Sequence, residues 1–394
     1  MTDLLYMAWR YVAFYRMKSV ILVGAIALVI FIPAGLRVLV RHGEVHLTAR
    51  ARVTPLLLGT RDSPLELALN TLYFSADVPE TLAFSTTKTI TASGLADAIP
   101  MSVRFRSQGD PIVGTSIDYF GFRGLEIATG RQMATLGECV VGAAIASGRQ
   151  VKPGDHVMSS PETMFDLAGA YPLKMRVTGV LAPSNSPDDH AIFVDVKTVW
   201  VIEGLGHGHQ DLAQPGAAGG VLRREGDTIV GNASVREYQE ITPQSIDSFH
   251  FHGLPATFPI TAVIAVPLDR KSEALLLGRY QAHEHLQLLR PTEVVDTLLA
   301  TVFSVQNVVV AALLIVGMAT LALVVLVFAL SLRLRRGEIA TMSKIGGSRA
   351  RIASILGMEM VGVLAIGLLL AAALTLATGQ LAPEIVRIVL SRGT

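Results

Sequence analysis

VVVAALLIVGMATLALVVLVFALSL, residues 308–332, is an apolar run that contains no charged residue. A bilayer core about 30 Å thick needs roughly 20 apolar residues in a helix, so this run predicts a transmembrane span. The basic loop LRLRRGEIATMSKIGGSRARI (332–352) follows, and a second apolar run extends from Ile352 to about Ala377. Short loops rich in Lys and Arg stay in the cytoplasm, so the loop is placed inside and both helices lead outwards from it.

A further span is predicted near the start of the chain, at Ser19–Leu36 (SVILVGAIALVIFIPAGL). A secretory signal peptide would share its basic start and apolar centre, but this run is longer and lacks a small-x-small cleavage site. Met1–Lys18 has an apolar stripe with basic residues, which predicts a helix lying on the membrane surface. The basic residues before the span place the N-terminus in the cytoplasm.

Residues 41–300 contain no run long enough to span, so they predict one extracytoplasmic domain of mixed α/β structure. The expected strands are Pro111–Ile117, Glu138–Val141, Lys174–Leu181, Ala191–Val194, Phe258–Val266 and His285–Leu289. The expected helices are Gly94–Ile99, Lys197–Ile202 (capped by Asp195), Lys271–Gln281 (capped by Asp269) and a helix over 291–307 that runs into the second span. Residues 204–253, rich in Gly, Ala and His, are expected to form a loop insertion.

The predicted fold class is therefore an α-helical membrane protein with three spans and a large α/β domain between spans one and two. Its parts are a cytoplasmic amphipathic helix (1–18), spans at 19–40, 301–334 and 352–379, the extracytoplasmic domain (41–300), a cytoplasmic coupling loop (335–351) and an extracytoplasmic tail (380–394).

The composition fits this organisation and excludes several classes. Hydrophobic residues make up 51% of the chain and charged residues only 16%, which is typical of a membrane protein with a soluble part. The net charge of +1 argues against nucleic-acid binding. Cys139 is the only cysteine, which excludes an intramolecular disulfide and a Cys-based metal cluster. The chain has no G-x-x-x-x-G-K-[ST] motif and no G-x-S-x-G motif, so it is expected to be neither a P-loop ATPase nor a serine hydrolase.

The basic loop also carries a resemblance. RRGEIATMSKIGGSRARI (Arg335–Ile352) resembles the R-x-x-E-I-x-x-x-x-A-x-G-A-x-x-x-x-I stretch of the MacB/LolC/FtsX superfamily of ABC transporter permeases. AWRYVAFYRMKSVILV (Ala8–Val23), GRQMATLGECVVGAAIA, VKPGD and MRVTGVLAPSNSPDDHAIFV are similar to further parts of that family. Family members usually have four spans, whereas this sequence predicts three. The resemblance implies a homodimer or heterodimer of permeases and a separate ATPase subunit that binds ATP and Mg²⁺.

In that reading the cytoplasmic loop is the surface that couples the chain to the ATPase. The residues implied are Arg335, Arg336, Glu338, Ile339, Lys344, Gly346 and Gly347. Glu338–Lys344 is expected to be a short helix that the two glycines end. The alternative is an ordinary positive-inside loop. Glu359 is a functional candidate because an ionisable residue inside a span is costly, although pairing with Arg349 or Arg351 would also explain it.

Histidines give a second signal. Six of the ten form H-x-H pairs: His207/His209, His250/His252 and His283/His285. On a strand, residues i and i+2 face the same way, so both imidazoles of a pair can reach one ion, preferably zinc, with copper or nickel as alternatives. His42 with His46, and Asp188 and Asp189 with His190, are further candidate groups. The alternative is a set of solvated loop residues with no fixed site.

Three functions remain open from the sequence. The first is the permease subunit of an ABC transporter in the bacterial plasma (inner) membrane, which exports or releases a substrate on the extracytoplasmic side. The second is an FtsX-like relay that signals to a periplasmic or envelope partner protein. The third is a zinc-linked permease or sensor that uses the H-x-H pairs.

Overall fold

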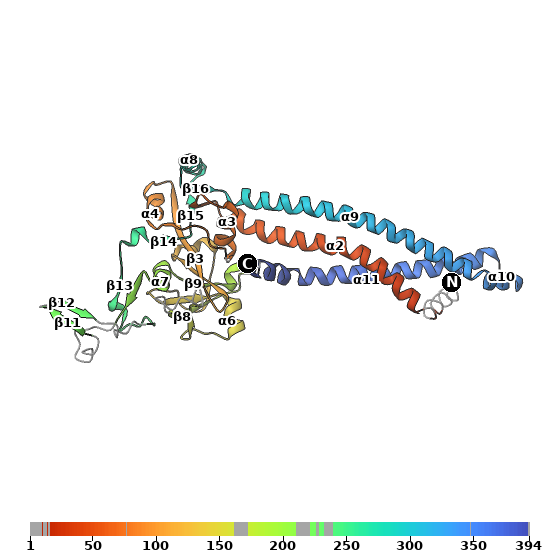
Figure 1. Cartoon of the computed structure of the whole chain (residues 1–394), viewed down its shortest axis with the longest axis horizontal. Coiled ribbons are helices and arrows are strands. Elements are labelled where there is room, and N and C mark those ends of the chain that lie inside the picture. Colours follow the sequence, from red (N-terminus) through yellow and green to blue (C-terminus); the bar gives the residue numbers. More distant parts are fainter. Residues whose placement is uncertain are drawn as a thin grey trace. The chain divides into compact units, whose positions relative to one another are not determined.

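The computed structural model describes residues 10, 14, 16–75, 77–160, 172–209, 221–225, 228–231, 239–346 and 348–392 (Figure 1). The chain divides into two compact units. The helical unit comprises Met1–Leu47 and Thr297–Arg392, and the α/β unit comprises Thr48–Asp296. The amphipathic helix expected at 1–18 lies almost wholly outside the described residues.

Long apolar helices dominate the helical unit. They are α2 (Arg16–Val53), α9 (Pro291–Leu334) and α11 (Arg349–Arg392), with the short α10 (Arg336–Lys344) between the last two. Three stretches are long and apolar enough to cross a membrane: Ser19–Val53, Val308–Leu334 and Ala350–Ala382. The three predicted spans are therefore confirmed, as is the helix over 291–307, which forms the start of α9. Helix α11 continues to Arg392, beyond the predicted end of the third span.

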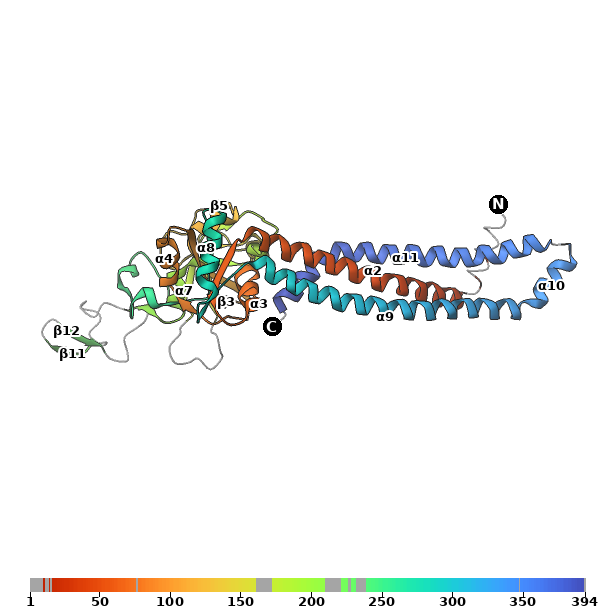
Figure 2. The same ribbon diagram turned by 90° about the horizontal axis from the view of Figure 1, so that it is seen from above.

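Helix packing inside this unit depends on small residues. Leu22 of α2, Phe328 of α9 and Val363 of α11 form a buried apolar cluster, so α2 lies alongside both other helices (Figure 2). A Cβ atom on Gly367 would lie 2.8 Å from Cγ2 of Ile26, so α11 approaches α2 as closely as glycine allows. Glycine at helix contacts of this kind is characteristic of membrane bundles, in which van der Waals packing replaces the hydrophobic driving force.

The α/β unit is built on a mixed sheet with the strand order β16-β1-β15-β3-β4-β9-β6-β8-β5, and β7 pairs with β8. The pairs β4–β9 and β6–β8 are parallel, and the other pairs of this sheet are antiparallel. The strands of the sheet are β1 (Leu56–Thr60), β3 (Ala96–Ser107), β4 (Asp110–Thr115), β5 (Ile127–Gly130), β6 (Glu138–Val141), β7 (His156–Met158), β8 (Lys174–Leu181), β9 (Ile192–Asp195), β15 (Ala262–Pro267) and β16 (Leu286–Leu289).

Short helices and small two-stranded ribbons complete this unit (Figure 1). The helices are α3 (Pro64–Tyr73), α4 (Ser85–Ala92), α5 (Asp118–Arg123), α6 (Ala143–Arg149), α7 (Val196–Ile202) and α8 (Arg270–Gln281). The ribbons pair β10 (Gly206–Gly208) with β13 (Phe249–Phe251), β11 (Val221–Glu225) with β12 (Thr228–Gly231), and β2 (Leu82–Ala83) with β14 (Pro259–Ile260). As predicted, Asp195 and Asp269 cap α7 and α8, accepting from backbone N–H groups of the first turn.

Helix α7 joins two apolar cores on the sheet. Val199 packs in a cluster with Cys139 and Met175, whereas Trp200 packs in a second cluster with Leu56. The Nε1–H of Trp200 donates to the carbonyl oxygen of Pro259 at 2.8 Å, so the buried indole is satisfied. Phe249 packs against the first core and Phe251 against the second.

Two sequence predictions are wrong. The segment Gly94–Ile99 is not a helix, because Ala96–Ser107 forms β3 and pairs with both β4 and β15. Sheet pairing with distant strands overrides the local preference here. The segment 204–253 is not simply a loop, because its described parts include β10 to β13. The other expected strands and helices match observed elements within a few residues.

Candidate functional site

The last turn of α2 belongs to the α/β unit and carries a buried arginine. Arg50 forms a bidentate ion pair with Asp188: Nη1 donates to Oδ2 at 2.5 Å, and Nη2 donates to Oδ1 at 2.9 Å. Its Nη2 also donates to the hydroxyl oxygen of Tyr119 at 2.6 Å, and that hydroxyl donates to Asp188 Oδ1 at 2.7 Å. The guanidinium lies over the ring of Phe74, with its Cζ atom 5.2 Å from the centroid. This network ties α2 to the one-turn 3₁₀ helix Pro187–His190.

Electrostatics keep the Asp188 carboxyl of this network ionised. Burial alone would raise the pKa of Asp188, but the charge of Arg50 and hydrogen bonds from Arg50, Tyr119 and Ser186 more than offset it, so the pKa lies below its usual value. Burial raises the pKa of Tyr119, which keeps its hydroxyl protonated as a donor. A buried carboxylate with a bidentate arginine partner holds its position firmly.

These contacts account for part of a group that the sequence suggested as a metal cluster. Asp189 accepts from the backbone N–H groups of Ser184 and Asn185 at 2.8 Å each, and Asp188 is occupied by Arg50. The carboxylate of Asp189 therefore stabilises the loop, and the carboxylate of Asp188 belongs to the ion pair with Arg50. Sequence reasoning missed Arg50, because its partner lies 138 residues away and no local pattern connects the two.

Helix α10 holds the residues predicted to contact an ATPase. Arg336 and Lys344 are exposed at its two ends, Ile339 is half-buried, and Arg335 is buried just before it. Gly346 follows the helix with φ +93°, a backbone conformation that suits glycine, and so ends it as expected. The side chains of Glu338 and Glu359, and all of Gly347, lie outside the described residues.

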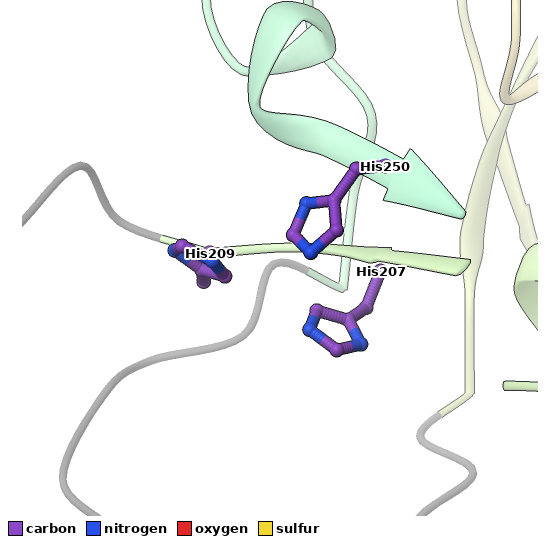
Figure 3. Close-up of side chains that lie close together, drawn as sticks. All are labelled: His207, His209 and His250. Atoms are coloured by element: carbon purple, nitrogen blue, oxygen red, sulfur yellow. The ribbon is translucent and has the colours of Figure 1, made fainter. Parts of the chain in front are cut away.

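Two of the three H-x-H pairs lie together on the β10–β13 ribbon. His207 is the direct antiparallel partner of His250 in the register of the two strands. One ligand atom from each of His207, His209 and His250 can be chosen so that all three lie within 4.8 Å of one another (Figure 3). His252 joins them, with its Nε2 3.5 Å from Nε2 of His207.

The third pair serves a different purpose. Nδ1 of His283 accepts from the backbone N–H groups of His285 and Leu286, at 3.2 and 3.1 Å, and its ring stacks on Tyr280. These bonds shape the turn between α8 and β16. Within the described residues, His283 and His285 take no part in the ribbon cluster. Nδ1 of His42 donates to the carbonyl oxygen of Val38 on its own helix at 2.9 Å, and the side chain of His46 is outside the described part.

Comparisons with known proteins identify the family. Residues 20–229, more than half of the chain, match the model of the MacB-like periplasmic core domain. The chain belongs to this family. The predicted resemblance to MacB-type ABC transporter permeases is confirmed. Membership of this family supports a function of the ABC transporter permease type. This MacB-like chain is a membrane protein with an extracytoplasmic domain.

Solved structures similar to this MacB-like chain are distant in sequence. The periplasmic region of MacB from Actinobacillus actinomycetemcomitans is 11% identical with a TM-score of 0.33, over 64% of this chain and 97% of that one. The extracellular domain of the noncanonic ABC-type transporter YknZ from Gram-positive bacteria is 12% identical with a TM-score of 0.33, over 59% and 98%. A domain of a putative permease protein from Porphyromonas gingivalis is 12% identical with a TM-score of 0.27, over 60% and 87%. A search of curated proteins gave no significant match.

Proposed function

We propose that this MacB-like chain is the permease subunit of an ABC transporter, driven by a separate ATPase subunit that docks on α10. ATP and Mg²⁺ bind to that partner, and this chain converts its motion into movement of the α/β unit on the extracytoplasmic side. In this proposal the N-terminus and α10 are cytoplasmic. The active assembly contains two permease chains, as the resemblance to this superfamily implies.

The surface of α10 carries this proposal. Ile345 is 81% exposed and Met342 is 41% exposed, although both are large apolar side chains. Met342 lies between the exposed cations Arg336 and Lys344, and Ile345 directly follows Lys344 at the end of the helix. An exposed apolar pair at the end of a short helix, next to basic side chains, is suited to a groove on another protein. The positive-inside rule explains the cations but does not explain the apolar side chains.

The path from α10 to the α/β unit is covalent. Helix α9 runs without a break from Pro291, in the α/β unit, to Leu334, and α10 begins at Arg336. A displacement of α10 is therefore applied directly to the end of a continuous helix. Arg50 supplies a second attachment, because it fixes the end of α2 within the α/β unit.

Co-purification tests the proposal. The full chain is isolated in mild detergent from its native membrane, and bound proteins are identified by mass spectrometry. We expect a P-loop ATPase with the unaltered chain and its loss with Ile345→Asp, because a carboxylate cannot enter an apolar groove without a desolvation cost. Ser343→Asp is the matched control, since it adds the same charge to an exposed position only two residues before Ile345.

If no ATPase is recovered with the unaltered chain, or if Ile345→Asp and Ser343→Asp retain it equally, α10 is not the docking surface. An ATPase whose activity responds to an envelope protein, with no cargo moved, would instead indicate the relay function.

A further inference from the structure

The β10–β13 ribbon has two chemically different faces. Gly206 pairs with Phe251 and Gly208 pairs with Phe249, so these four residues share one face. Side chains alternate along a strand, which places His207 and its partner His250 on the other face. A Cβ atom on Gly208 would lie 2.4 Å from Cδ2 of Phe249, so the glycines leave room for the two rings.

The aromatic face anchors the ribbon to the α/β unit. The ring of Phe251 lies 6.2 Å from that of Trp200 and 5.9 Å from that of Phe258, between centroids. Phe249 packs against the other core, which contains Cys139. Because both rings are fixed by the cores, the imidazole face is turned outwards in a defined orientation.

The outward face gathers four imidazoles. The ring centroids of His207 and His250 are 5.0 Å apart, and those of His209 and His250 are 5.2 Å apart. His252 extends the array beside His207, with 4.7 Å between centroids. Two ligand nitrogens on a tetrahedral zinc ion, each about 2.0–2.1 Å from the metal, lie about 3.3 Å apart. The observed 3.5 Å between Nε2 of His207 and Nε2 of His252 is close to that spacing.

A backbone contact fixes the tautomer of one imidazole. Nδ1 of His250 lies 3.1 Å from the carbonyl oxygen of Ser248. A carbonyl oxygen only accepts, so Nδ1 carries the hydrogen and Nε2 keeps its lone pair. A backbone partner of this kind is the usual support of a histidine that ligates a metal.

We propose that His207, His209 and His250 bind one divalent transition-metal ion, with His252 as the nearest fourth ligand. Imidazole nitrogen favours zinc, copper and nickel over calcium and magnesium, which prefer oxygen ligands. Zinc is the favoured ion because its structural sites take four nitrogen or sulfur ligands, and the ribbon brings four imidazoles together. Within the described residues the ligand group contains no carboxylate, so the site should prefer zinc, copper or nickel to metals that bind oxygen ligands.

A metal ion in this position would fasten β10 to β13. The two strands precede and follow residues 210–248, so the ion would hold the two ends of that segment together. Such a metal crosslink stabilises the folded state, since it joins two strands about 40 residues apart in the chain and forms only when the ribbon is folded. The proposal goes beyond the permease function and does not depend on it.

Metal titration of the full chain in detergent tests this site. The protein is produced without a polyhistidine tag, stripped with chelator and titrated with Zn²⁺ by calorimetry, while Co²⁺ is followed by its visible absorption. We expect one Zn²⁺ per chain, an intense Co²⁺ spectrum typical of four-coordinate sites, and a Zn²⁺-dependent rise in Tm. His207→Ala with His250→Ala abolishes all three signals, and His252→Ala weakens zinc binding by on the order of tenfold or more.

The third H-x-H pair supplies the matched control. His283→Ala with His285→Ala removes the same number of imidazoles and should leave zinc binding unchanged. Circular dichroism and gel filtration establish that each variant is folded. The proposal is overturned if zinc binds more weakly than about 10 μM. It is also overturned if binding survives His207→Ala with His250→Ala, or is lost only with the 283/285 variant.

Discussion

Arg50 and Asp188 are 138 residues apart in the chain and form a buried bidentate ion pair, with Nη2 2.9 Å from Oδ1 and Nη1 2.5 Å from Oδ2. The side chains are only 7% and 1% exposed. Through this pair, the end of α2 is bonded to the segment that precedes β9. An apolar replacement of either partner alone would leave the other charge buried without compensation.

Removing the arginine should therefore be costly. We expect Arg50→Ala to lower the free energy of unfolding of the α/β unit by about 3–5 kcal/mol. Arg52→Ala is the matched control, because Arg52 is exposed two residues further along the same helix; its effect should stay within about 0.5 kcal/mol. Denaturant unfolding followed by the fluorescence of buried Trp200 measures both. Equal effects of the two variants would show that the ion pair does not anchor α2.

Glu138 makes stability depend on pH in the acid range. Burial of its carboxyl would raise the pKa, but Arg131 and the backbone N–H groups of Ala134 and Thr135 donate to it and lower the pKa from 4.5 to about 2. Because the pKa in the folded state is depressed, the stabilisation is complete above pH 4.5 and is lost as pH falls towards 2.

We expect Glu138→Gln to be less stable than the unaltered chain at pH 6 and to approach it at pH 2.5. Thermal unfolding, followed by circular dichroism across this range, measures the difference. A gap between the two proteins that stays constant with pH would contradict the assignment of Glu138 as the titrating group.

Packing at Gly367 provides a test within the helical unit. Because a Cβ atom there would lie 2.8 Å from Ile26 Cγ2, Gly367→Leu should force α11 away from α2 and destabilise the unit by about 1–3 kcal/mol. Gly362→Leu is the control, since the structure describes no atom within 4 Å of a Cβ at that position. The control should be neutral or slightly stabilising, because leucine favours helix more than glycine does.

Loss of helical circular dichroism on heating in detergent distinguishes the two glycine variants. If Gly362→Leu destabilises the protein as much as Gly367→Leu does, the close approach of α2 and α11 is not what stabilises this unit.

The sequence was informative where local patterns determine structure. The apolar runs predicted all three spans, and the strand patterns at Glu138–Val141 and Lys174–Leu181 matched β6 and β8. The β10–β13 ribbon was missed, because glycine and histidine are weak strand formers and its two strands are about 40 residues apart. The H-x-H spacing nevertheless pointed to the residues that the ribbon brings together, His207, His209, His250 and His252.

The Arg50–Asp188 pair could not be found in the same way. Its arginine sits in the unremarkable segment ARARV at the end of an apolar helix, and its aspartate in a polar turn. Only the tertiary structure brings the two together. The metal hypothesis for Asp188 and Asp189 arose from composition alone, whereas burial and hydrogen bonding give both carboxylates structural partners.

Site-directed crosslinking from α10 tests the permease function most directly. Cys139 is the only cysteine and is buried, so Ile345→Cys introduces a single reactive thiol at an exposed position. A thiol-linked photocrosslinker is attached in native membranes, and the product is identified by mass spectrometry. Leu254→Cys, exposed in the α/β unit, is the matched control. We predict an adduct between position 345 and a P-loop ATPase, and none from position 254; the absence of an ATPase adduct at 345, or its appearance at 254, would contradict the account.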